Sequence, residues 1–182
     1  AANGAFWAVG AVYVQHIGYS VDTVAIFMAS VVVAGAISQW PIGLLSDQID
    51  RRLVIIAVAI ACAASGILLA VTGTNSMQSL LIGGMCFGLS GMPIFGLSVA
   101  HANDRAEPHE YVTLAAGLLL LYGVGAVAGP LIATAVMSQF GAQTLFGHTS
   151  AIYVALALFG LFRLLVSDRP SRKQREDFVA VP

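Results

Sequence analysis

The chain has 182 residues, of which 58% are hydrophobic and 9% charged, and its formal net charge is −1. Soluble domains carry about 45–50% apolar and 25% charged residues, so this composition excludes an ordinary soluble domain and is typical of a membrane protein. Because the net charge is near zero, the positions of the charges along the chain are more informative than their sum.

Apolar segments follow one another along the chain, separated by short polar stretches. The run from Leu53 to Asn103 contains no Asp, Glu, Lys or Arg and is interrupted by the polar stretch 72–76, which indicates two spans joined by a turn. Because backbone groups in lipid must be hydrogen-bonded within the chain, each span is predicted to be a helix. We predict six spans, with approximate bounds 1–18, 22–45, 53–73, 77–101, 111–138 and 149–167.

The fold class expected is therefore all-α integral membrane, a six-transmembrane-helix bundle over residues 1–167, with a polar cytoplasmic tail at 168–182. All basic residues lie after span 2, after span 4, or at or after the end of span 6: Arg51, Arg52, Arg105, Arg163, Arg169, Arg172, Lys173 and Arg175. By the positive-inside rule, both termini are then cytoplasmic, and an even number of spans agrees with that orientation. The chain starts without Met in apolar sequence, so we expect it to be part of a longer protein.

The first span combines aromatic and polar side chains on one helical face. Asn3, Phe6, Trp7, Gly10 and Tyr13 recur at helical spacing, and such a face near mid-membrane is suited to a substrate cavity. Span 2 adds further polar and aromatic residues. The candidate cavity residues are Asn3, Trp7, Tyr13, Gln39 and Trp40. Interfacial aromatics and ordinary packing are the alternative interpretation.

A charge cluster follows span 2. Asp47 lies at the carboxyl end of that helix, where a negative charge is unfavourable, so it needs a partner: Arg51 or Arg52, or the N-terminus of another helix. Candidate gate residues are Gly43, Asp47, Arg51 and Arg52. The alternative is an ordinary loop cluster that fixes the topology.

Small residues recur at four-residue spacing in two spans. Gly84 and Gly88 form one such pair, and Gly125 and Gly129, followed by Pro130, form another. In lipid this spacing allows close contact between helix backbones, either as static packing or as a contact that slides or rocks.

The segment from Gly43 to Leu53 resembles the signature loop of the major facilitator superfamily, G-x-L-(small)-D-R-x-G-R-(R/K). The matching positions are Gly43, Leu45, Asp47, Arg51 and Arg52. Gln48 and Asp50 depart from the pattern, as the degenerate copy in the second half of these proteins does. The stretch from Gly125 to Pro130 also looks like the Gly-Pro helix of this family.

The resemblance implies the C-terminal six-helix half of a transporter whose partner is its own N-terminal half. In such a half, helices 1 and 4 line the cavity, helices 2 and 5 meet the other half, and helices 3 and 6 face lipid. The acidic residue of the loop, here Asp47, holds the two halves together on the inner side in one conformation and releases them in the other.

These features predict a secondary active transporter of a small-molecule substrate, working by alternating access in the bacterial inner membrane. A transporter-like protein used for assembly or sensing, and a subunit of an oligomeric channel, are the alternatives. No metal cluster, nucleophile motif or phosphate loop is found in the sequence, so we expect no enzyme, cofactor or metal. The lipid bilayer is the expected environment, and nothing indicates a nucleic-acid partner.

Overall fold

The computed structural model describes residues 1–166, which form helices and the turns between them. The elements are α1 (Ala2–His16), α2 (Val21–Gln48), α3 (Arg51–Thr72), α4 (Met77–Gly91), α5 (Pro93–Asn103), the 3-10 helix η1 (Pro108–Glu110), α6 (Tyr111–Phe140) and α7 (Thr144–Val166). No strand occurs in this part of the chain, and the all-α prediction is confirmed. The expected tail at 168–182 lies outside the described residues.

Polar side chains at the helix starts explain where several spans begin. The Ser20 hydroxyl accepts the backbone N–H of Thr23, and the Ser76 hydroxyl accepts that of Ser79. The Asp50 carboxylate accepts the N–H of Arg52 at 3.0 Å and so starts α3 directly after α2. Each cap satisfies a backbone donor that has no partner within its helix.

Five helical segments are long and apolar enough to cross a membrane: α2, α3, α4 together with α5, α6 and α7. One predicted bound was wrong, the start of the last span, and two other spans have features that the hydropathy pattern did not show. The described α1 has 15 residues, fewer than the roughly 20 that cross the hydrocarbon core. The span at 77–101 is divided at Met92, and the last helix starts at Thr144 rather than at 149.

The early start of α7 has a physical reason. Thr144 and Thr149 donate hydroxyl hydrogen bonds to backbone carbonyls three residues earlier, and Ser150 donates to the Ala63 carbonyl of α3 at 3.0 Å. These polar groups are therefore satisfied inside the helix bundle and do not end the span.

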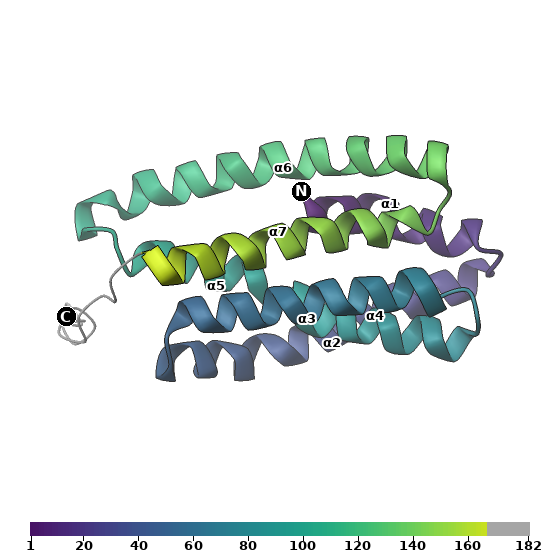
Figure 1. The fold of residues 1–182 in the computed structure, drawn as a ribbon, viewed down its shortest axis with the longest axis horizontal. Helices are drawn as coiled ribbons and strands as arrows, with labels where there is room; N and C mark the ends of the chain where they lie inside the picture. Colours follow the sequence, from purple (N-terminus) through teal and green to yellow (C-terminus); the bar gives the residue numbers. More distant parts are fainter. Residues whose placement is uncertain (167–182) are drawn as a thin grey trace.

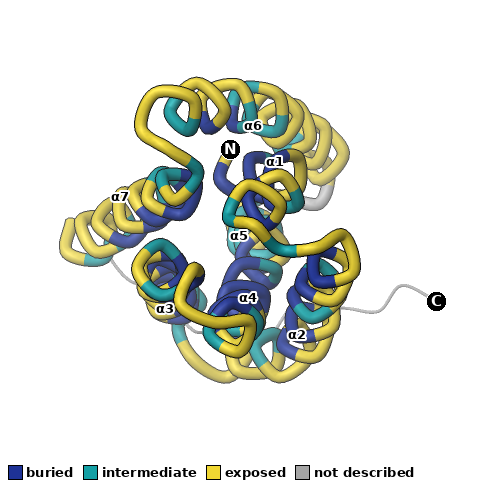
Figure 2. The backbone as a smooth tube through the Cα atoms, turned by 90° about the vertical axis from the view of Figure 1, so that its right-hand side faces the viewer, coloured by how far each residue is buried: buried dark blue, intermediate teal, exposed yellow. Residues whose placement is uncertain are grey.

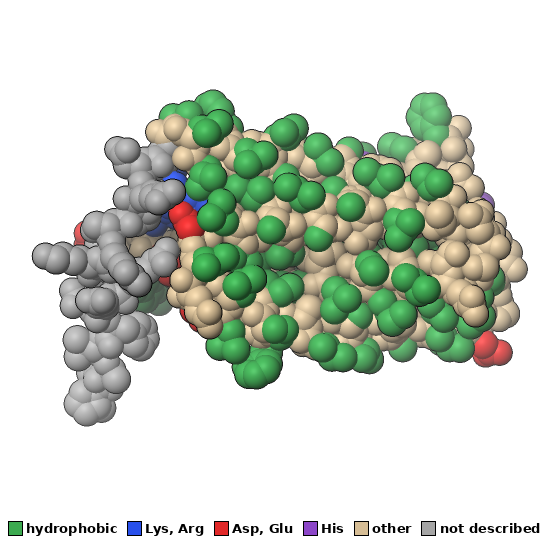
Figure 3. Space-filling view, turned by 60° about the horizontal axis from the view of Figure 1, so that its bottom comes forward, with side chains coloured by type: hydrophobic (Ala, Val, Ile, Leu, Met, Phe, Trp, Pro, Cys, Tyr) green, Lys and Arg blue, Asp and Glu red, His purple; other side chains and the backbone are tan. Residues whose placement is uncertain are grey.

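Successive long helices run antiparallel (Figure 1). The turns after α2 and α5 and the end of α7 lie at one end of the bundle, and the turns after α1, α3 and α6 lie at the other. The basic residues within 1–166, Arg51, Arg52, Arg105 and Arg163, belong to the first of these ends. Figure 3 shows hydrophobic side chains along the flank of the bundle and charged ones at its ends. This distribution is that of a protein whose flank is in lipid.

The core is built around aromatic rings from four helices. Phe6 of α1 packs against Phe27 of α2, Phe87 of α4 and Phe146 of α7, with ring centroids 5.1–6.4 Å apart. Helix α3 packs on α4 and α7, α2 packs on α4, and α1 packs on α6 and α7. Figure 2 shows α6 as a mostly exposed helix. In an apolar stretch of 18 residues in α6, 6% of the residues are buried, against 56% in such a stretch of Met77–Asn103. Most of the surface of α6 is therefore available to lipid or to another part of the protein.

Candidate substrate cavity and conformational gate

The fourth membrane span, Met77–Asn103, is divided near its middle into α4 and α5. Pro93 has no N–H group, so it cannot donate to the Leu89 carbonyl one turn earlier, and α4 gives way to α5 at this point. The preceding residues Gly91 and Met92 keep the backbone helical, and the Met92 N–H still donates to the Gly88 carbonyl at 3.2 Å. The backbone therefore stays helical through the span, but one turn lacks a hydrogen bond.

A shallow depression, too small to hold a water molecule by itself, lies beside this weakened turn and is called the hollow. Asn3 and Trp7 of α1 line it with Val31 of α2 and with the α4 residues Phe87, Gly88, Gly91 and Met92. Trp7 is 40% exposed and Asn3 is half-buried, so both present polar or aromatic groups at the surface of the bundle. Two of the five candidate cavity residues therefore lie together, next to the break in the span.

The other three candidate cavity residues do not line this hollow. Tyr13 is fully buried, stacks edge-on against Phe146 and donates its hydroxyl to the Leu69 carbonyl at 3.3 Å. Gln39 lines a second pocket, and Trp40 lies 75% exposed on α2. Tyr13 therefore packs against α7 inside the bundle, apart from the hollow, and its role in a substrate cavity stays a prediction.

The second pocket, of 270 Å³, contains most of the predicted gate. Gly43, Ser46 and Asp47 of α2 line it together with Arg51 of α3 and with Gly96, Leu97 and Ala100 of α5. A side chain added at Gly43 would meet open space as far as residues 1–166 are concerned. The pocket is therefore a notch between α2 and α5 at the basic end of the bundle.

Arg51 is the centre of this notch. Its Nη2 lies 2.7 Å from the Asp47 carboxylate, one turn back along the chain, and its Nε lies 3.5 Å from the carboxylate of Asp104 after α5. The Arg51 side chain is 13% exposed, whereas that of Asp47 is 65% exposed. Asp47 thus has a partner within this half, and its outer side remains accessible.

Arg52 departs from the expected gate. Although it is adjacent to Arg51, it is buried and lines a different pocket, with residues of α5 and α7. Successive residues in the first turn of a helix point about 100° apart, so the two arginines are directed to different neighbours.

The glycine pairs lie at close contacts between helices. A Cβ added at Gly88 would overlap the Val31 backbone of α2, and one added at Gly84 would overlap the Phe27 ring. A Cβ added at Gly125 or Gly129 would overlap the backbone of Ala1 at the start of α1. Pro130 follows inside α6, which continues to Phe140. Both pairs therefore lie where backbones approach closely.

Sequence reasoning missed His148 and a cluster of cations. His148 falls inside α7 because that helix starts early, and its Nε2 is buried without a hydrogen-bond partner among the described residues. Arg52, Arg105 and Arg163 line one pocket, although they are more than 50 residues apart along the chain. The one-sided basic pattern placed them at one end of the bundle, but only the packing of α3, α5 and α7 brings them together.

Comparisons with known proteins agree on one family. The family model described as Major Facilitator Superfamily matches residues 1–180. An uncharacterised MFS-type transporter of Enterobacter sp. (strain 638) is 30% identical over 162 residues, which cover 85% of this chain and 40% of that protein. The uncharacterised MFS-type transporter YcaD of Shigella flexneri is 30% identical over 158 residues, with the same coverage. YcaD of Salmonella arizonae is 28% identical over 158 residues. No solved structure matches.

Proposed function

We propose, since the chain belongs to the major facilitator superfamily, that it is the C-terminal half of a carrier that moves a small solute by alternating access. The chain is part of an integral membrane protein of a transport family, not an enzyme. It spans 40% of the length of the relatives it matches, and the N-terminal six-helix half is the partner that we assign to the remainder. The relatives are bacterial, and we place the protein in the inner membrane with both termini cytoplasmic.

One observation supports this proposal more than the others. The hollow lined by Asn3 and Trp7 lies against the turn of the fourth span that Pro93 weakens. Substrate sites of secondary transporters lie near the bilayer midplane, beside interrupted helices. A solute held between this hollow and the opposite half would therefore contact a helix that can bend.

In the proposed cycle, the notch between α2 and α5 is the site where the inner side closes. Asp47 is mostly exposed at the cytoplasmic end of α2, and Gly43 leaves open space beside it. We infer that a helix end of the N-terminal half occupies the notch when the inner side is closed and leaves it when the inner side opens. Arg51 then holds Asp47 in place in both states.

A labelling experiment tests the cycle without knowledge of the substrate. In the full-length protein with Cys62 and Cys86 replaced by Ala, Asn3→Cys is exposed to a membrane-impermeant thiol reagent from either side of sealed vesicles. Alternating access predicts labelling from both sides, with reciprocal changes in the two rates when Asp47→Asn is added. Leu158→Cys, 61% exposed on α7, is the control and should stay unlabelled in lipid.

Two results would contradict the proposal. Labelling of Asn3→Cys from one side alone, unchanged by Asp47→Asn, would favour a static protein used for assembly or sensing. Labelling from both sides with single-channel conductance in planar bilayers would favour a channel.

A further inference from the structure

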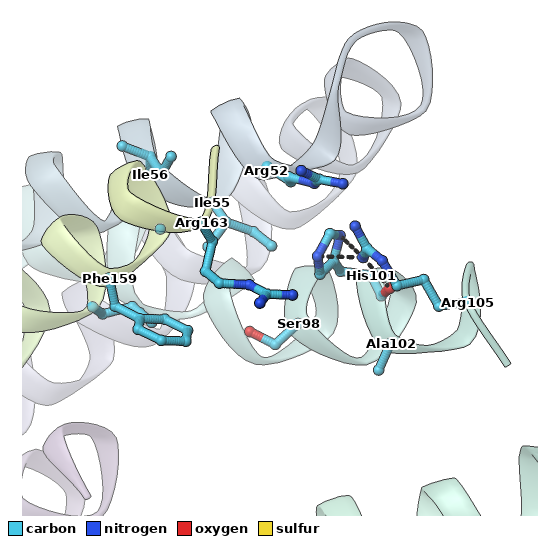
Figure 4. Close-up of a pocket in the computed structure, with 11 residues that line it drawn as sticks. Arg52, Ile55, Ile56, Ser98, His101, Ala102, Arg105, Phe159 and Arg163 are labelled. Carbon is cyan, nitrogen blue, oxygen red and sulfur yellow. Dashed lines mark hydrogen bonds between the residues drawn. The ribbon is translucent and has the colours of Figure 1, made fainter. Parts of the chain in front are cut away.

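A pocket of 410 Å³ lies between α3, α5 and α7 at the basic end of the bundle, apart from the gate notch. Four side chains that carry or can carry positive charge line it (Figure 4). Arg52 comes from α3, His101 and Arg105 come from the end of α5 and the turn after it, and Arg163 comes from α7. Three separate segments thus direct cations toward one space.

The electrostatics of this pocket favour an anion. Nη1 of Arg105 lies 2.5 Å and 3.2 Å from the two ring nitrogens of His101, and since arginine only donates, the histidine ring accepts. Burial and then the nearby Arg52 lower the pKa of the Arg105 guanidinium, with Arg163 contributing in the same direction and Asp104 opposing it. The guanidinium nevertheless stays charged, so the three arginines bring like charges together.

Among residues 1–166, two carboxylates near these cations also have other partners. Asp104 lies 3.5 Å from Arg51 on the gate side, and Asp50 caps the start of α3. No Asp or Glu belongs to the pocket lining among residues 1–166. A phosphate group placed here would relieve the repulsion between the arginines and could accept several charge-assisted hydrogen bonds.

The rest of the pocket is apolar and continues toward the flank of the bundle. Ile55 and Ile56 of α3 and Leu156 and Phe159 of α7 complete the lining, and Phe159 is 62% exposed. In an apolar stretch of 18 residues in α7, 22% of the residues are buried, so most of this helix surface is open to lipid. A ligand that fits both parts has an anionic head at the membrane surface and a hydrocarbon chain below it.

We propose that this pocket binds the headgroup of an anionic phospholipid, with an acyl chain along Phe159. Basic pockets between transmembrane helices on the cytoplasmic side are suited to such headgroups. A soluble phosphate would match the arginines but leave the apolar lining unused. The bound lipid would join the ends of α3, α5 and α7, and this inference requires the membrane setting but not the proposed transport cycle.

The test measures lipid binding to the full-length protein in detergent by native mass spectrometry, with phosphatidylglycerol and phosphatidylcholine as probes. We expect preference for phosphatidylglycerol, and a loss of affinity of about thirtyfold in the Arg105→Gln/Arg163→Gln variant, since each basic residue near an anionic headgroup is worth about fivefold. Both side chains are exposed, so the variant should keep its elution volume. Arg169→Gln/Arg172→Gln removes the same charge from the polar segment that follows α7 and should retain the preference.

A second pair of variants separates a lipid from a soluble anion. Phe159→Ser should weaken phosphatidylglycerol binding several-fold, whereas Phe162→Ser, 59% exposed on the same helix but outside the lining, should not. Competition by millimolar inorganic phosphate with no effect of Phe159→Ser would show a soluble-anion site and overturn the proposal. Equal losses in both arginine pairs would overturn it in favour of diffuse surface attraction. Tighter lipid binding by Glu176→Gln/Asp177→Asn than by the wild type would assign the pocket to the carboxylates of residues 168–182 instead.

Discussion

Arg51 contacts two carboxylates that come from different helices, and this contact defines the gate at the residue scale. The pair with Asp47 is partly exposed, so its contribution is below about 1 kcal/mol. An ion pair of that size cannot hold a whole transporter in one state. It can, however, bias two states that lie close in free energy.

We therefore expect Asp47→Asn to shift the population toward the inward-open state by at most about fivefold. Turnover should fall while substrate affinity stays near the wild-type value, because Asp47 lies at the membrane surface and not beside the hollow. Spin-label distances across the cytoplasmic side, measured with the flux, check this. Asp22→Asn, at the opposite end of the same helix, is the matched control. A sharp loss of affinity with unchanged distances would contradict the expectation.

Contacts between residues close together in the sequence could be predicted, whereas contacts that depend on the packing of distant helices could not. The contact of Asp47 with Arg51 spans one helical turn, so the sequence contains the necessary information. Tyr13 has the periodicity of a cavity residue, but its burial depends on Phe146, which lies far along the chain. The pocket formed by Arg52, Arg105 and Arg163 likewise depends on three helices that meet only in the fold.

At the scale of elements, the contact between α1 and α6 is one of the places where a glycine of one helix lies against the backbone of another. Gly129 lies against the Ala1 backbone, and Gly4 of α1 lies against the Ala126 backbone of α6. The contact is therefore made by small residues from both helices. Because most of α6 is otherwise exposed, this contact is a principal connection between α6 and the rest of the bundle.

Gly129→Leu should separate α1 from α6 and destabilise the protein by about 1–3 kcal/mol, with a larger loss of transport than of membrane insertion. Thermal unfolding in detergent, expression level and flux in proteoliposomes measure the three effects. Gly123→Leu, on the same helix where an added side chain meets open space within the described residues, is the control. Normal stability and flux in Gly129→Leu would mean that this face of α6 can yield without consequence.

The membrane spans could be predicted from hydropathy, because every segment that crosses the lipid core must be helical here. The bounds of a span were harder to predict where polar residues lie inside the helix. The start of α7 was misplaced because Ser150 and Thr149 are satisfied by backbone carbonyls in the folded bundle, which the sequence does not reveal. The break at Pro93, by contrast, follows from the missing N–H of a single residue.

The arrangement of charge over the whole molecule argues for one orientation in the membrane. Arg51, Arg52, Arg105 and Arg163 lie at one end, and the turns at the other end carry no Lys or Arg in the described part of the chain. Cytoplasmic loops retain Lys and Arg because these residues resist translocation. The proposed lipid pocket lies at the same end. In the predicted orientation, that end faces the negatively charged inner leaflet.

We therefore expect the turns after α1, α3 and α6 to be extracellular or periplasmic, and the turns after α2 and α5 to be cytoplasmic. In the full-length protein with Cys62 and Cys86 replaced by Ala, single cysteines at Ser20, Asn75 and Ala142 should react with an impermeant thiol reagent added outside intact cells. Cysteines at Asp104 and Ser171 should react only after the membrane is opened, and they serve as the internal control because the two groups must behave oppositely. If Asn75→Cys reacted only from the cytoplasm, the gate and the lipid pocket would both lie on the outer side, where neither the proposed inner closure nor an inner-leaflet lipid could reach them.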